Sequence, residues 1–123
     1  MELTKKLHFF HPEVATKYGV DEAIMLSHLI YWIATNSIAG RNYIDGRHWT
    51  FNSAVKFAQY LPYWSEGQIR RVLKSLLKQD IIIDGNYDGH KYDRTKWYAL
   101  YDEKYWLTNY HPVNRIDNWE DPY

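Results

Sequence analysis

The segment from Ser65 to Lys78 limits the possible folds of this 123-residue chain more than any other segment. Ser65 and Gln68 have the spacing of a capping box, in which two side chains satisfy backbone N–H groups at the start of a helix. At 100° per residue, the apolar side chains that follow gather on one face of that helix. They are Ile69, Val72, Leu73, Leu76 and Leu77. We therefore predict an amphipathic helix over 66–78 with one face in a hydrophobic core.

The opposite face of this predicted helix is basic. Arg71, Lys74 and Lys78 fall on it, together with Ser75. Arg70 lies nearer the edge of the apolar face, where we expect it to reach a phosphate or a neighbouring carboxylate. Such a row of cations suits a phosphate backbone, although a solvated surface helix that binds nothing also carries lysine and arginine.

The neighbouring segments complete a known order of elements. Phe51-Asn52-Ser53 offers a cap for a helix that continues to about Leu61 and stops at Pro62. After the basic helix, the β-branched run 81–83 and the alternating residues 94–100 predict a β-hairpin with a polar loop between them. Helix, turn, basic helix and hairpin follow one another in a winged helix-turn-helix. We therefore predict an α+β fold of that class.

The N-terminal part of the chain predicts two more helices and a turn. The first helix covers 12–18, with Pro12 in its first turn, and the second covers about 21–35. The Asp45-Gly46 pair predicts a hairpin or sharp turn between residues suited to strands.

The C-terminal part is expected to contain one or two helical turns over 103–108. We expect a single winged-helix domain over 1–108, followed by an acidic, aromatic tail over 109–123 in an extended conformation.

Charge is unevenly distributed along the chain. The 15 basic and 15 acidic side chains cancel, so net charge gives no indication of a nucleic-acid partner. Residues 41–96, however, hold ten basic and six acidic side chains, whereas residues 97–123 hold two and five. A basic middle is thus offset by an acidic end.

Several classes of protein are disfavoured by composition. The absence of cysteine excludes disulfides and thiolate metal sites, and the six histidines show no metal-ligand spacing. No phosphate-binding loop or catalytic motif stands out, so we expect neither a cofactor nor an enzyme. No apolar run could span a bilayer, and the N-terminus lacks the apolar region of a signal peptide. We expect a cytoplasmic protein without a membrane partner.

Two stretches carry a resemblance to a known family. They are Trp49-Thr50-Phe51-Asn52-Ser53 and Tyr92-Asp93-Arg94-Thr95-Lys96-Trp97-Tyr98-Ala99-Leu100, and residues 65–73 add to them. In these residues the chain resembles the N-terminal winged-helix domain of replication initiators, or replisome organisers, of bacteriophages and mobile elements. The resemblance covers roughly residues 9–102 and extends to DnaD-like helicase-loader relatives.

The resemblance implies binding to origin DNA or loading of a helicase. Members of the family usually continue into a second domain, often of the DnaD-like type. We therefore expect either a small standalone protein or a fragment of a larger initiator.

The predicted site is a contact surface for double-stranded DNA. Its residues are Arg70, Arg71, Lys74, Ser75, Lys78, Lys91 and Arg94. The helical residues would enter the major groove, and Lys91 and Arg94 in the hairpin loop would reach the DNA backbone or the minor groove. Alternatively, Arg94 pairs with Asp93 and the loop is merely solvated.

Partners beyond DNA are also expected. The N-terminal helices and the abundant aromatic residues could form a homodimer interface, and the tail could bind a replication protein. The main rival hypothesis is a winged helix used for protein interaction, such as a replication adaptor or a phage anti-host factor, which zero net charge and the acidic tail favour. A transcriptional repressor of the same fold is a third possibility.

Overall fold

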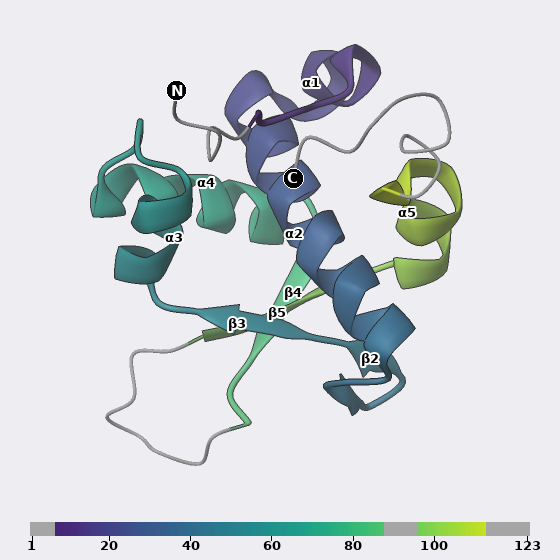
Figure 1. The fold of residues 1–123 in the computed structure, drawn as a ribbon. Helices are drawn as coiled ribbons and strands as arrows, with labels where there is room; N and C mark the ends of the chain where they lie inside the picture. Colours follow the sequence, from purple (N-terminus) through teal and green to yellow (C-terminus); the bar gives the residue numbers. More distant parts are fainter. Residues whose placement is uncertain (1–6, 88–95, 113–123) are drawn as a thin grey trace, which may run out of the picture.

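The computed structural model describes residues 7–87 and 96–112, and these form an α+β fold. Five helices and two small antiparallel sheets are present in the described part (Figure 1). In chain order the elements are α1 (Pro12–Tyr18), α2 (Val20–Ala39), β1 (Tyr43–Ile44), β2 (Arg47–His48), β3 (Thr50–Asn52), α3 (Ala54–Tyr60), α4 (Glu66–Lys78), β4 (Ile82–Gly85), β5 (Lys96–Leu100) and α5 (Glu103–Tyr110).

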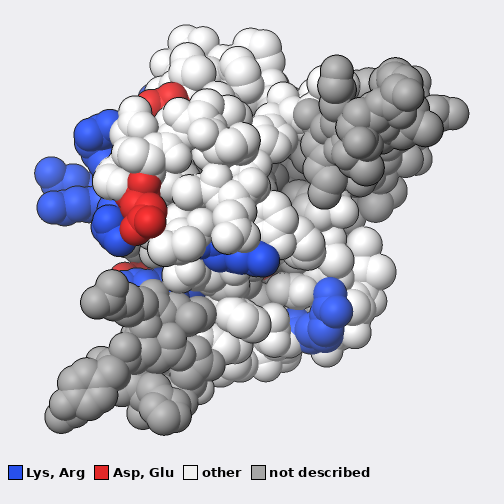
Figure 2. Space-filling view, turned by 60° about the vertical axis from the view of Figure 1, so that its left-hand side comes forward, with Lys and Arg blue, Asp and Glu red and all other residues white. Residues whose placement is uncertain are grey.

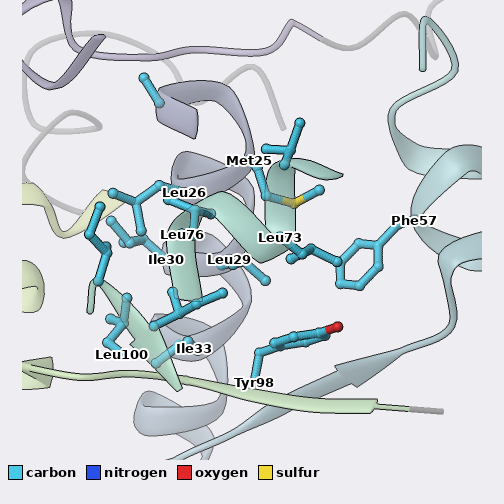
Figure 3. Packing of buried hydrophobic residues seen from close by; sticks show 14 of the residues in the cluster. Met25, Leu26, Leu29, Ile30, Ile33, Phe57, Leu73, Leu76, Tyr98 and Leu100 are labelled. Carbon is cyan, nitrogen blue, oxygen red and sulfur yellow. The ribbon is translucent and has the colours of Figure 1, made fainter. Parts of the chain in front are cut away.

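Helix α2 is the centre of the main core. It runs through the middle of the molecule, with α3 and α4 on one side, α5 on the other and the larger sheet below (Figure 1). Because it is covered from several directions, its apolar residues are not confined to one stripe. Side chains from four elements meet around it in Figure 3: Met25, Leu26, Leu29, Ile30 and Ile33 from α2, Phe57 from α3, Leu73 and Leu76 from α4, and Tyr98 and Leu100 from β5.

The larger sheet has the strand order β3-β5-β4, with both pairs antiparallel. Successive side chains of a strand point to opposite faces. Tyr98 and Leu100 of β5 therefore join the main core, whereas Trp97 and Ala99 join a second apolar cluster on the outer face. The middle strand is thus buried on both sides.

The second cluster attaches the β1–β2 hairpin to the sheet. Trp49 packs with Trp97 and donates a hydrogen bond from Nε1 to the Ile44 carbonyl at 2.9 Å. Tyr87, just beyond β4, donates from its hydroxyl to Asp45 Oδ2 at 3.0 Å. These contacts brace the β4–β5 pair from the side away from the main core.

Most local predictions from the sequence are confirmed. The structure shows helices at 12–18 and 66–78, an N-cap at Ser53 that accepts from the Lys56 N–H at 3.2 Å, and a hairpin turning at Asp45-Gly46. The α+β winged-helix fold class is also confirmed, because the helix, turn, helix and paired strands occur in that order.

Three predicted boundaries were wrong. Helix α2 begins at Val20 and continues to Ala39 instead of ending near Thr35, because Gly40 adopts the left-handed conformation, φ 68°, that closes its C-terminus. Helix α5 extends to Tyr110, so residues 109 and 110 are helical rather than extended. Phe51 and Asn52, expected to belong to a helix cap, lie in strand β3.

No helix among the described residues is long and apolar enough to cross a membrane. The predicted tail residues 113–123 and most of the hairpin loop lie outside the described part of the chain.

Candidate nucleic-acid interface

Helix α4 is fixed in position at its start and along its inner face. Ser65 Oγ accepts from the Gln68 N–H at 3.2 Å, and Gln68 Oε1 accepts from the Ser65 N–H at 2.9 Å, which completes the predicted capping box. Ile69 and Leu76 are fully buried against the core. Because the inner face is held in this way, the direction of the outer face is determined.

The outer face of α4 presents the predicted cations to solvent. Arg71, Lys74 and Lys78 are all exposed. Ser75 is only half-buried, but its hydroxyl accepts from Gln79 Nε2 at 3.1 Å, and the same amide group contacts the Tyr18 carbonyl at 3.4 Å. Ser75 therefore helps to hold the end of α4 against α1. Arg71, Lys74 and Lys78 are the better candidates for contacts with a ligand.

Arg70 behaves as one of its two predicted alternatives. Its Nη2 lies 3.2 Å from Glu66 Oε1, one helical turn earlier, and both side chains are largely exposed. Such an exposed pair contributes only about 0.3–0.5 kcal/mol, so Arg70 could exchange this partner for a phosphate at little cost. The pair does, however, reduce the positive charge at the start of α4.

A groove of about 520 Å³ runs beside α4 towards the sheet. Among the described residues, its charged lining comprises Glu66, Arg70 and Lys74 from α4, Asp84 from β4 and Lys96 from β5. Lys96 was not among the predicted site residues, although the alternation of β5 places it on the same side as Tyr98. The groove is thus mixed in charge, with three cations and two carboxylates.

Figure 2 shows the side of the molecule that carries α3 and α4. Basic atoms gather towards the left of this face with acidic atoms among them, and most of the remaining described surface is uncharged. The positive region is therefore local, in agreement with the zero net charge of the chain.

Tyr98 forms part of the groove floor. Burial raises the pKa of its hydroxyl to about 12, and the nearby Asp84 carboxylate acts in the same direction because it repels a phenolate. Tyr98 therefore remains a neutral hydroxyl at physiological pH and can donate a hydrogen bond.

The hairpin residues predicted to contact DNA, Lys91 and Arg94, lie outside the described residues. The strands that lead to them are described, and β4 and β5 pair from Ile82 with Leu100 to Gly85 with Trp97.

No protein-family model, curated protein or solved structure matches this chain. The resemblance to replication initiators consequently stays a prediction from the sequence. The evidence for a function comes from the surface of α4 and the groove beside it.

Among the described residues, no group of three or more histidine, aspartate or glutamate side chains is arranged to hold a metal ion.

Proposed function

We propose that this chain binds double-stranded DNA through the outer face of α4. The observation that carries the proposal is the exposed row of Arg71, Lys74 and Lys78 on a capped helix whose opposite face is buried in the core. A helix fixed in this way loses little conformational freedom when it docks.

The chemistry of the row suits a duplex. An α-helix fits the major groove, where arginine can donate two hydrogen bonds to the O6 and N7 atoms of guanine. We assign this role to Arg71. Lys74 and Lys78 would neutralise phosphates and release counterions, which gives affinity without sequence preference.

The groove beside α4 extends this contact surface. Arg70 and Lys96 would lie along the sugar-phosphate backbone, while Glu66 and Asp84 oppose close approach of phosphates at their own positions. Affinity of a single copy should therefore be modest. We propose that two copies act together, since exposed apolar side chains near the N-terminus, Leu7, Phe10 and Val20, are available for an interface.

The cellular role that we propose is replication initiation, or replisome organisation, on a phage or mobile element in the cytoplasm. This step rests on the resemblance of residues 49–53 and 92–100 to such initiators. As part of the same proposal, the chain binds a second replication protein.

A pair of matched variants tests the DNA contact. We would measure duplex binding by fluorescence anisotropy across a salt series for Lys74→Ala and for Lys104→Ala, which removes an exposed lysine from α5 on the other side of α2. Lys74→Ala should weaken binding to all sequences and reduce the slope of log K against log salt by about 1, whereas Lys104→Ala should change neither. Equal effects of the two variants would show that binding reflects general charge, and would count against a site on α4.

A further inference from the structure

A second hollow, of about 400 Å³, lies beside strand β3 on the edge of the sheet. Its walls come from the C-terminal half of α2, the loop after it, β3 and the end of α3, and its lining includes Trp32, Arg41, Asn42, Phe51, Asn52 and Tyr60. Asn52 is the one described residue that it shares with the groove beside α4. The hollow is therefore a separate feature next to the proposed duplex site.

Three aromatic residues, each from a different element, belong to the lining of this hollow. Phe51 of β3 is stacked on Trp97, with ring centroids 4.5 Å apart and an interplanar angle of 29°, and yet its side chain is 45% exposed. Tyr60 of α3 lies 6.0 Å from Trp32 of α2. An exposed ring already supported from behind is a ready surface on which a further planar group can stack.

The polar part of the hollow is held rigidly. Asn36 and Asn42 both donate from their side-chain amides to the Trp49 carbonyl, at 2.8 and 3.3 Å. The backbone N–H of Arg41 donates to the Asn36 carbonyl at 2.8 Å, next to the left-handed Gly40. The backbone that carries Arg41 is therefore fixed, while its side chain is exposed.

The charge of the hollow selects the kind of ligand. Among the described residues that line the hollow, Arg41 is the one charged residue, it makes no ion pair with another described residue, and none of them is a carboxylate. Lys56 adds a second cation nearby, with Nζ 5.6 Å from the centroid of Tyr60. A ligand that combines a planar apolar ring with an anionic group matches this arrangement.

We infer that the hollow binds an unpaired nucleotide of a single DNA strand, with the base stacked on Phe51 and the phosphate at Arg41. A base inside a duplex is paired and covered on both faces, so it cannot enter. Because Asn52 belongs to both the hollow and the groove beside α4, the chain would hold a single strand next to a duplex. The proposed function requires only the duplex contact.

The test compares two DNA forms and two sets of variants. We would measure anisotropy with a labelled twelve-nucleotide oligothymidine and with a duplex, for Phe51→Leu and for Arg41→Ala. Tyr43→Leu and Lys104→Ala are the matched controls, because they remove an exposed aromatic ring and an exposed cation outside the hollow. Phe51→Leu keeps an apolar side chain over Trp97, and thermal unfolding by circular dichroism verifies that each variant is folded.

The Phe51→Leu variant loses one base-stacking contact, so it should bind the single strand about 5- to 150-fold more weakly than the unmodified protein. Arg41→Ala should also weaken it and lower its salt dependence, while both controls bind like the unmodified protein and duplex binding is unchanged. The triple variant Arg71→Ala, Lys74→Ala, Lys78→Ala should show the reverse pattern, with duplex binding lost and single-strand binding kept.

Three outcomes would overturn the inference. The first is the absence of oligothymidine binding at low salt, and the second is equal binding by the hollow variants and their controls. The third is loss of single-strand binding in the triple α4 variant, which would place both DNA forms on α4. If the unmodified protein binds oligothymidine but no duplex, the proposed function fails while the inference about the hollow stands, so the two failures are distinguishable.

Discussion

At the scale of single residues, Tyr98 has the most strongly perturbed chemistry in the candidate site. Its pKa is raised from 10.0 to about 12, so the folded state disfavours the phenolate relative to the unfolded state. The stabilisation associated with the neutral hydroxyl is fully present below about pH 10 and is lost as the pH rises towards 12.

We therefore predict that raising the pH above about 10 destabilises Tyr98→Phe less than it destabilises the unmodified protein. Two units of pKa correspond to about 2–3 kcal/mol of unfolding free energy. When the pH is raised from about 9 to about 11.5, the unmodified protein should lose most of this amount in addition to the loss that the variant shows. Urea denaturation at both pH values provides the measurement, and the other tyrosines are common to both proteins. Parallel losses of stability in the two proteins would show that Tyr98 ionises as it does in the unfolded chain.

At the scale of elements, the glycine in β4 and the glycine in α4 differ in the space around them. A Cβ on Gly85 would lie 2.9 Å from Tyr87 Cε2 and 3.3 Å from Trp49, the two rings that hold the β1–β2 hairpin on the sheet. A Cβ on Gly67, in the first turn of α4, would have no neighbour closer than Ser65 Oγ at 3.9 Å.

The same substitution should consequently have opposite effects at these two positions. Gly85→Ala should destabilise the fold by about 1–3 kcal/mol through overpacking. Gly67→Ala should stabilise it by about 0.5–1 kcal/mol, because alanine loses less backbone entropy in a helix. Chemical denaturation of both variants tests this, and a neutral Gly85→Ala would mean that the hairpin does not brace the strands.

Elements defined by nearby residues could be predicted from the sequence, and those defined by distant contacts could not. The capping box joins Ser65 to Gln68, three residues away, and the predicted helix agrees with α4 at both ends. Strand β3 has only three residues and exists because it pairs with β5, as in the pair Phe51 and Trp97. No local pattern encodes that partner, so Phe51 and Asn52 were assigned to a helix cap.

The same distinction applies to the candidate site. Arg71, Lys74 and Lys78 could be placed on an exposed face because helical periodicity alone separates them from the buried residues. Lys96 was missed because its position beside α4 depends on how the sheet packs against that helix. The pair between Arg70 and Glu66 follows from a spacing of four residues and was one of the expected alternatives.

At the scale of the whole molecule, the proposed dimer requires the exposed apolar side chains near the N-terminus to lie in its interface, and this can be tested. Val20 is the first residue of α2, and its side chain is exposed. An acidic residue at a helix N-terminus interacts favourably with the helix dipole, so Val20→Asp should fold normally while disfavouring an apolar interface.

We expect sedimentation velocity to show a dimer for the unmodified protein and a monomer for Val20→Asp at the same concentration. Asp21→Ala, which keeps an apolar residue at position 20, is the control and should remain dimeric. A monomeric unmodified protein, or a dimer that tolerates Val20→Asp, would contradict an interface at this surface.

The central claim is that the cations of α4 carry DNA binding, and the salt dependence of duplex affinity tests it most directly. The unmodified chain should bind duplex DNA with an affinity that falls steeply with salt. The folded triple variant Arg71→Ala, Lys74→Ala, Lys78→Ala should lose affinity at low salt together with about 3 units of the slope of log K against log salt. A triple variant with the affinity and slope of the unmodified protein, or an unmodified protein that binds no duplex at low salt, would contradict the account.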